Sequence, residues 1–306
     1  MGKEDKLTFL IFNTAYFGDV LLCSSLCQNI KNIWPNSKII FVVRKQFYET
    51  AKYLKGVDDV VIFDKSGEHK GLFGILKFVK NFKYKKADYS IITYYNHRNK
   101  FISKLLGVKK IIMEEKVTDL IPNWIKHNDL LKKITDKKIE NFPMVYNAQK
   151  EIGRKFFENN KRYIALCPTT KNKAKDIPHN ITAELINSLN DEGLTPILTG
   201  AGKAAEEYSK ILHSKNLNFL DLTDKTSIYE LGCVLKNCEG LISADTGTMH
   251  LGCAVDMPVV AVFYQKDKLV NWAPSALQYR CFVISTNQTA EHIMNETIKI
   301  LGDTNE

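Results

Sequence analysis

The chain has 306 residues, of which 44% are hydrophobic and 25% charged, and this is the composition of a globular protein long enough for two domains with full cores. No stretch approaches the roughly 18 consecutive apolar residues of a membrane-spanning helix, and the charged N-terminus does not have the pattern of a signal peptide, so we expect a cytoplasmic protein. The net charge of +9 is unevenly distributed along the chain. Residues 1–160 contain 29 Lys and Arg and 17 Asp and Glu, whereas residues 161–306 contain 14 Lys and Arg and 17 Asp and Glu.

Short apolar runs alternate with helical patterns through the first half of the chain. Strands are expected at residues 7–12, 38–43, 60–63 and 89–93. Helices are expected at residues 20–33, 46–54, 71–82 and 99–106. This alternation predicts a parallel sheet covered by helices on both faces.

A second copy of the pattern begins near residue 162, after a polar stretch at 135–147 and an expected helix around 148–159. Its strands are expected at residues 163–167, 196–199, 218–220, 240–243 and 259–263. The sequence therefore predicts two doubly wound α/β domains with a cleft between them. Ligands of such sheets bind beyond the carboxyl ends of the strands.

A glycine turn follows the first strand and carries Gly18 and Asp19 at the start of the next helix. The helix dipole stabilises a carboxylate in this position, so Asp19 is expected to stay ionised and to be able to accept a proton from a bound hydroxyl. A plain helix cap is the competing interpretation.

The loop after the first strand of the second half mixes hydroxyls with lysines. Thr169 and Thr170 open it, and Lys175 ends it just before a helical pattern. Ammonium groups and hydroxyl donors together suit a diphosphate, although a solvated loop has the same composition.

Residues 199–205 present a rival motif. Gly200, Gly202 and Ala205 fit the pattern G-x-G-x-x-A, and Asp221 follows about twenty residues on, as in a nicotinamide-dinucleotide site. The loop lies in the second rather than the first strand–helix unit of its half, so we favour a tight turn.

The most distinctive stretch is 243–254, where a short turn joins an apolar strand to an apolar helix. The unpaired N–H groups of a first helical turn and the positive end of the helix dipole bind phosphate readily. Asp245 and His250 flank this turn, with groups able to contact a ribose, a diphosphate or a leaving oxygen. The stretch therefore predicts a phosphate-binding junction.

The basic first half is expected to face an anionic partner, such as a phosphorylated acceptor, an anionic membrane surface or nucleic acid; a solvated basic surface is an equally good interpretation. The seven cysteines form no C-x-x-C pair, so we expect reduced thiols and no zinc site.

Taken together, these motifs resemble the ADP-heptose:lipopolysaccharide heptosyltransferases of glycosyltransferase family 9. The residues that carry the resemblance are Gly18-Asp19-Val20-Leu21-Leu22, Lys175, Leu222-Thr223 with Lys225-Thr226-Ser227, and Asp245 to Leu251 leading to the strand at 258–263. The resemblance implies a GT-B fold, with two Rossmann-like domains at 1–160 and 161–288, and with the last helix, 289–302, able to pack back on the first domain. It also implies inverting, metal-independent sugar transfer, and the sequence contains no D-x-D triplet.

The resemblance assigns roles to individual residues. It places the catalytic base on Asp19. The residues implied to bind the donor and its phosphates are Thr169, Thr170, Lys175, Asp245, Thr246, Gly247, Thr248 and His250. Further candidates are Gly200, Glu206 and Thr226 for the nucleotide, and Gly18 and Arg98 for the acceptor. The chain departs from the family pattern at Asn13, Ile177 and Tyr264.

The implied partners are a nucleotide sugar, expected to be ADP-heptose, and an anionic acceptor, which is Kdo–lipid A or a core oligosaccharide. The resemblance also implies a cytoplasmic protein that is peripherally bound to the inner face of the cytoplasmic membrane. No further cofactor, no metal and no nucleic acid is expected. The alternatives are a glycosyltransferase for another nucleotide sugar, a nicotinamide-dependent oxidoreductase that uses the Gly200–Gly202 loop, and a non-catalytic nucleotide or anion-binding protein.

Overall fold

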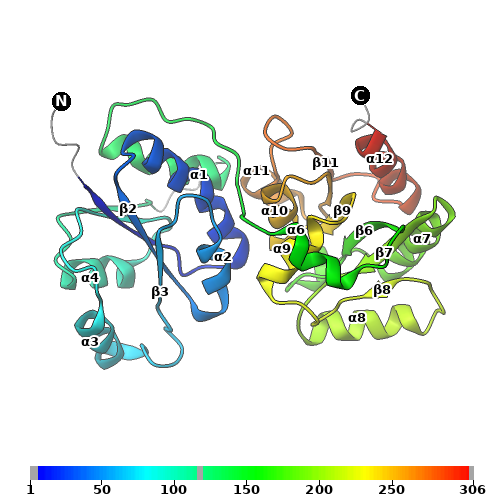
Figure 1. Cartoon of the computed structure of the whole chain (residues 1–306), viewed down its shortest axis with the longest axis horizontal. Helices are drawn as coiled ribbons and strands as arrows, with labels where there is room; N and C mark the ends of the chain where they lie inside the picture. The colour runs from blue at the N-terminus through cyan, green and yellow to red at the C-terminus, as the bar shows by residue number, and fades with distance from the viewer. Residues whose placement is uncertain (1–5, 116–119, 303–306) are drawn as a thin grey trace. The chain divides into compact units, whose positions relative to one another are not determined.

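The structure, a computed structural model, describes residues 6–115 and 120–302 (Figure 1). The chain divides into two units, Met1–Met144 and Val145–Glu306. Each unit contains a parallel sheet with helices, as the alternating apolar runs predict. The cleft expected between the domains stays a prediction.

Within residues 6–115, the first unit forms a five-stranded parallel sheet in the order β3-β2-β1-β4-β5. Its strands are β1 Thr8–Phe12, β2 Lys38–Val43, β3 Asp59–Ile62, β4 Tyr89–Ile92 and β5 Lys110–Met113. Its helices are α1 Phe17–Ile33, α2 Tyr48–Lys52, α3 Gly71–Asn81, α4 His97–Leu105 and α5 Asn123–Asp129. The sequence did not predict β5 or α5.

Alternate residues of the first sheet face opposite layers, as in any strand. Leu10 and Phe12 of β1 pack in one buried cluster with Ile75 of α3 and Ile102 of α4. Helices α3 and α4 therefore cover the same face of the sheet.

Within residues 145–302, the second unit forms a six-stranded parallel sheet in the order β11-β10-β9-β6-β7-β8. Its strands are β6 Arg162–Cys167, β7 Leu194–Leu198, β8 Leu220–Asp221, β9 Gly240–Ala244, β10 Val259–Val262 and β11 Cys281–Ile284. Its helices are α6 Lys150–Gly153, α7 His179–Asp191, α8 Lys203–His213, α9 Ile228–Leu235, α10 Gly247–Ala254, α11 Leu269–Trp272 and α12 Ala290–Gly302. Of the strands, the sequence missed only β11.

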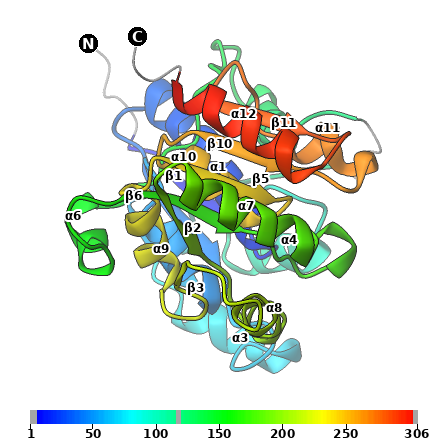
Figure 2. The ribbon, with the colours of Figure 1, turned by 90° about the vertical axis from the view of Figure 1, so that its right-hand side faces the viewer.

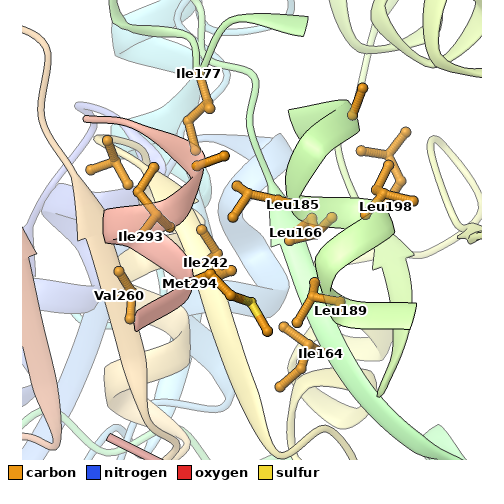
Figure 3. Packing of buried hydrophobic residues seen from close by; sticks show 14 of the residues in the cluster. Ile164, Leu166, Ile177, Leu185, Leu189, Leu198, Ile242, Val260, Ile293 and Met294 are labelled. Carbon is orange, nitrogen blue, oxygen red and sulfur yellow. The ribbon is translucent and has the colours of Figure 1, made fainter. Parts of the chain in front are cut away.

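The last helix, α12, belongs to the second unit. Its Ile293 and Met294 pack in one buried cluster with Ile164 of β6 and Leu189 of α7 (Figure 3). Figure 2 shows α7 and α12 side by side over the second sheet. The apolar side of this helix therefore forms part of the core of the second unit, and the expectation that residues 289–302 pack back on the first domain stays a prediction.

The boundary between the units also differs from the expected one at 160. The Tyr146 N–H donates to the Ala254 carbonyl at 2.8 Å, and the Tyr146 ring is buried against Gly232. The Lys236 ammonium donates to the Ala148 carbonyl at 3.2 Å. Residues 145–160 therefore belong to the second unit, and the helix expected around 148–159 is the single turn α6 followed by the 3-10 turn Arg154–Phe156.

Replacing Gly153 with Ala is expected to destabilise the second unit. A Cβ at this position would lie 2.1 Å from the Cys233 carbonyl oxygen and 2.5 Å from the Asn237 amide nitrogen, so α6 and α9 would be forced apart. We expect a loss of about 1–3 kcal/mol in urea unfolding. Gly302→Ala is the matched control, because a Cβ there meets no heavy atom within 4 Å. Equal stability of the two variants would contradict the close packing of α6.

No helix in the described part of the chain combines the length and the apolar character needed to cross a membrane.

Candidate functional site

Each sheet has one point where successive connections run in opposite directions, and ligands of doubly wound sheets bind there, beyond the carboxyl ends of the strands. In the first sheet this point lies between β1 and β4, and in the second it lies between β6 and β9. The loops that leave these four strands carry most of the residues singled out by the sequence.

In the first unit, Asn13 joins the two loops at the switch point. Its side-chain amide donates to the Thr93 hydroxyl at 3.0 Å and to the Asp19 carbonyl at 3.1 Å. Its own oxygen accepts from the Ala15 N–H at 3.1 Å. Asn13 is buried, so this departure from the family pattern fixes the start of α1 relative to the end of β4.

Asp19 lies in the first turn of α1, directly after the buried Gly18. Tyr16 rather than Asp19 is the N-cap of α1, and the Asp19 carboxylate, three residues on, accepts from the Tyr16 N–H at 3.0 Å and so helps to fix the start of the helix. Burial raises the pKa of Asp19 to about 6, against the lowering effect of that hydrogen bond and of the Arg44 charge. A carboxylate with a pKa near neutrality suits a general base, and that role stays a prediction.

Asp19→Asn is expected to stabilise the chain at neutral pH. The folded-state pKa of about 6 lies above the ordinary 3.8, so the ionised carboxylate costs stability above pH 6, and this cost disappears below about pH 4, where the group is protonated in both states. An amide oxygen keeps the bond from Tyr16. Urea unfolding should show a variant more stable by about 1–3 kcal/mol at about pH 7.5 and equal to the parent at about pH 4. A variant less stable at the higher pH would refute the raised pKa.

A second carboxylate, Glu114, lies at the same edge of the first sheet and was missed by the sequence reasoning. It follows β5 directly, and its N–H donates to the Ile92 carbonyl at 2.9 Å. Burial raises the pKa of Glu114 to about 7; Lys126 lowers it and the Asp19 charge raises it further. Its carboxylate lies 4.0 Å from the ring of the buried His127 of α5, whose pKa burial lowers to about 4. The residue was missed because β5 was missed.

Three basic residues gather at the same edge. Arg44 follows β2, Lys65 lies in the loop after β3, and Arg98 lies in the first turn of α4. Burial lowers the pKa of Lys65, and the charges of Arg44 and Arg98 lower it further. The sequence singled out Arg98 alone. The position of Arg44 and Lys65 just after two predicted strands was the signal that would have found them.

In the second unit, Lys175 and Asp245 meet at the switch point. Lys175 ends the 3-10 turn Lys173–Lys175 after β6, and Asp245 follows β9, which pairs with β6. The Lys175 ammonium lies 2.5 Å from the Asp245 carboxylate. The Lys175 side chain is 20% exposed and that of Asp245 is 9% exposed. The structure thus brings together two candidates that lie 70 residues apart in the sequence.

The predicted phosphate junction is confirmed as a strand–turn–helix. Helix α10 begins at Gly247, and Thr246 before it has extended backbone angles and makes no side-chain cap bond. The N–H groups of the first turn are therefore without a side-chain cap, as an anion site requires. Thr248 is buried in that turn and contacts Cys167 at the end of β6.

His250 is buried one turn further along α10, 6.3 Å between ring centres from Trp272. Burial lowers the pKa of His250 to about 4, against the raising effect of Asp245, so the ring is neutral at physiological pH. Its Nδ1 atom has no hydrogen-bond partner within the described structure. A neutral imidazole with a free ring nitrogen can still donate or accept one hydrogen bond.

The two threonines of the 168–175 loop differ in their surroundings. Thr170 makes its hydrogen bonds within the loop. Its N–H donates to the Asp176 carboxylate at 2.7 Å, and its hydroxyl donates to the Asn172 carbonyl at 2.7 Å. Thr169 is nearly buried, and its hydroxyl lies 3.1 Å from where a Cβ on Gly200 would be. Gly200 therefore allows the close approach of the loops after β6 and β7.

The bonds of the 199–205 loop favour a tight turn over a nicotinamide-dinucleotide site. The Gly202 N–H donates to both carboxylate oxygens of Asp224, at 2.8 and 3.0 Å, so this chain's own carboxylate occupies the amide that a pyrophosphate would need. Asp221 accepts from the Thr223 N–H at 2.8 Å and also bonds Ser209 and His213. The tight-turn interpretation of the motif fits the structure.

The remaining nucleotide candidates follow β7 and β8. Glu206 is exposed in the first turn of α8, and Thr226 precedes Ser227, the cap of α9. Neither is hydrogen-bonded to Lys175 or Asp245 in the described structure. Within residues 6–115 and 120–302, no three His, Cys, Asp or Glu side chains are grouped so as to hold a metal ion. The cysteines are free thiols.

Two doubly wound α/β units, each with polar loops at its switch point, define the GT-B class of folds. The sequence model of glycosyltransferase family 9 (heptosyltransferase) matches residues 127–300, more than half of the chain. The chain belongs to this family, as the resemblance predicts.

Individual relatives agree with this assignment. A segment of 105 residues, 33% of this chain, is 30% identical to the lipopolysaccharide heptosyltransferase 2 of Salmonella typhimurium and covers 30% of that protein. The match therefore spans less than a third of the relative. The solved glycosyl transferase of family 9 from Veillonella parvula has a TM-score of 0.86 at 16% identity, with 98% of each chain covered. E. coli heptosyltransferase WaaC with ADP has a TM-score of 0.78 at 18% identity, with 96% of this chain and 100% of that chain covered.

Proposed function

We propose that the chain is an inverting, metal-independent glycosyltransferase that moves a heptose from ADP-heptose to an anionic inner-core acceptor of lipopolysaccharide or lipooligosaccharide. The observation that carries the proposal is the Lys175–Asp245 pair beside a helix start without a side-chain cap, in a chain of glycosyltransferase family 9. A diphosphate needs positive charge and N–H donors in one place, and this edge of the second sheet supplies both.

The second unit binds the donor in this proposal. The Lys175 ammonium neutralises one phosphate, and the amides of Gly247 and Thr248 donate to the other. Asp245 holds Lys175 in place before the donor binds. The solved heptosyltransferase that carries ADP supports a nucleoside diphosphate as the ligand class. Gly200, Glu206 and Thr226 stay candidates for contacts to the nucleoside.

The first unit supplies the base. Asp19 takes the proton from an acceptor hydroxyl, and the oxygen forms a bond to the anomeric carbon of the heptose from the face opposite the diphosphate. The bond from that carbon to the phosphate oxygen breaks, and ADP leaves with both electrons of the bond. Lys175 and the α10 amides stabilise the charge that develops on the leaving oxygen, so no metal is needed for this step.

The anionic acceptor is held by the basic residues at the edge of the first sheet. Arg44, Lys65 and Arg98 lie close enough that two of these charges lower the pKa of the third. An anion relieves such repulsion, and Arg binds carboxylate or phosphate through two parallel hydrogen bonds. Kdo–lipid A and core oligosaccharides carry these groups. The acceptor is membrane lipid or is attached to it, so the proposed location is the cytoplasmic side of the inner membrane.

Protection against thermal unfolding by a panel of nucleotide sugars tests the donor. ADP-heptose is expected to stabilise the chain most, by about 2.7 kcal/mol when its concentration is about 100 times its dissociation constant. The panel includes other ADP- and UDP-sugars, and NADH as the control for dinucleotide binding. Stronger protection by another nucleotide sugar would identify that compound, rather than ADP-heptose, as the donor. Protection by NADH alone would overturn the proposal.

A further inference from the structure

Helix α3 has apolar side chains on both its inner and its outer side. Ile75 and Phe78 are buried in the core of the first unit, as expected for a helix that covers a sheet. Leu72, Phe73 and Leu76 point the other way, and Phe73 is 87% exposed. A phenylalanine is among the residues most costly to leave in water.

The exposure of Phe73 is not due to a loosely held helix end. His69, just before α3, stacks on Phe63 with ring centres 5.6 Å apart and meets Phe78 edge-on at 5.1 Å. Its ring nitrogen Nδ1 accepts from the Asp64 N–H at 3.0 Å. The start of α3 is therefore fixed by packing, and Phe73 is held in an exposed position.

Helix α4 extends this apolar surface. Phe101 and Leu105, one turn apart on α4, are also exposed. Helices α3 and α4 pack against each other and cover the same face of the first sheet (Figure 1). The sides of α3 and α4 that do not contact the sheet therefore face the same direction. We call the five exposed residues the α3–α4 surface; they are Leu72, Phe73, Leu76, Phe101 and Leu105.

Basic residues surround the α3–α4 surface. Residues 71–110 contain ten Lys and Arg and a single acidic residue, Asp88, which is paired with Lys109 at 2.7 Å. Lys80 of α3 and Lys104 of α4 are exposed on the two helices themselves, and Lys77 of α3 is exposed and paired with Glu68 at 2.8 Å. Apolar side chains and lysines on one surface are the combination that binds the interface of an anionic bilayer.

We propose that the α3–α4 surface docks the chain on an anionic lipid bilayer, with Phe73 and its apolar neighbours in the headgroup region and the surrounding lysines on the lipid phosphates. The inference rests on the proposed function only in that the acceptor of the sugar is anchored in a membrane. A second copy of the chain fits this surface less well, because a symmetric pair would place the same cations against one another.

Sedimentation with phosphatidylcholine vesicles, with and without phosphatidylglycerol, tests the proposal in the absence of any substrate. The full chain is expected to bind the anionic vesicles and to lose binding as salt is added. The double variant F73S/L76S should bind them roughly tenfold or more weakly, because it removes two apolar groups from the interface. Leu277→Ser is the matched control, since Leu277 is 98% exposed in the second unit.

The charge contribution is tested with K80E/K104E, which should lose roughly fivefold or more in affinity for each lysine, against Lys203→Glu as the control in the second unit. Equal binding by the parent, F73S/L76S and K80E/K104E overturns the proposal. The proposal is also overturned if the parent is a dimer in analytical ultracentrifugation and F73S/L76S is a monomer. The α3–α4 surface would then be a contact between two copies of the chain. Thermal protection by ADP-heptose does not involve this surface, so protection without vesicle binding contradicts the docking proposal alone, and vesicle binding without protection contradicts the proposed function alone.

Discussion

Asp19→Asn is expected to lower the rate of heptosyl transfer by roughly 10²–10⁴-fold and to leave donor binding nearly unchanged. The amide keeps the hydrogen bond that Asp19 accepts from the Tyr16 N–H, so the start of α1 is retained while the ability to take a proton is lost. The measurement is single-turnover transfer at saturating donor, together with donor affinity from thermal protection.

The pH dependence separates Asp19 from other carboxylates. Below pH 6 the base is protonated, so transfer by the parent should fall about tenfold per pH unit below its pKa of about 6 and level off above it. Glu114→Gln is the matched control, since Glu114 lies at the same sheet edge and its pKa is also raised. The acid limb near pH 6 should persist in this control. A limb that persists in the Asp19 variant and disappears in Glu114→Gln would assign the base to Glu114.

Lys175→Met is expected to weaken the binding of ADP and of the donor by roughly 10–100-fold and to slow transfer at saturating donor as well. A charge-assisted bond to the diphosphate is lost, and it strengthens as the leaving oxygen becomes charged. Lys173→Met is the matched control, because Lys173 lies in the same 3-10 turn but is 80% exposed and only loosely paired with Glu207 at 3.8 Å. Isothermal titration with ADP gives the affinity.

This variant also leaves the Asp245 carboxylate, whose side chain is only 9% exposed, without its partner, and that alone would destabilise the chain. The double variant K175M/D245N removes both charges and separates the two effects. Its stability should return toward that of the parent while its affinity for ADP stays low. Recovery of affinity together with stability would contradict the phosphate role of Lys175 and leave it a structural ion pair.

The parallel sheets could be predicted from the sequence because strands that are buried on both faces are continuous apolar runs, such as those of β1, β2, β6 and β10. The two missed strands, β5 and β11, are at sheet edges and are short apolar runs that follow a basic residue. Residues 145–160 are tied to the second unit by contacts distant in sequence, among them the bond from the Tyr146 N–H to the Ala254 carbonyl and the packing of the Tyr146 ring against Gly232, and no local pattern encodes these contacts.

The candidate site was predictable where a motif carried it. Asp245 was singled out by the strand–turn–helix pattern at 243–254, and Lys175 by the composition of the loop before α7. Only the fold shows that the two side chains meet. Arg44, Lys65 and Glu114 belong to no motif. Arg44 and Lys65 follow predicted strands, but only the sheet order shows that the ends of β2, β3 and β5 lie at one edge. The position of the G-x-G motif in the second strand–helix unit already favoured a tight turn, but a pattern of residue types does not show that the Gly202 N–H donates to Asp224.

Direct assay of sugar transfer tests the proposed reaction. The chain is incubated with ADP-heptose and truncated lipooligosaccharide acceptors, and the product is examined by mass spectrometry and by nuclear magnetic resonance of the new anomeric centre. We predict one added heptosyl residue per acceptor, release of ADP, and a glycosidic bond of anomeric configuration opposite to that of the donor, in the presence of a metal chelator. A product that retains the donor's configuration, or transfer that stops when the chelator is added, would contradict it.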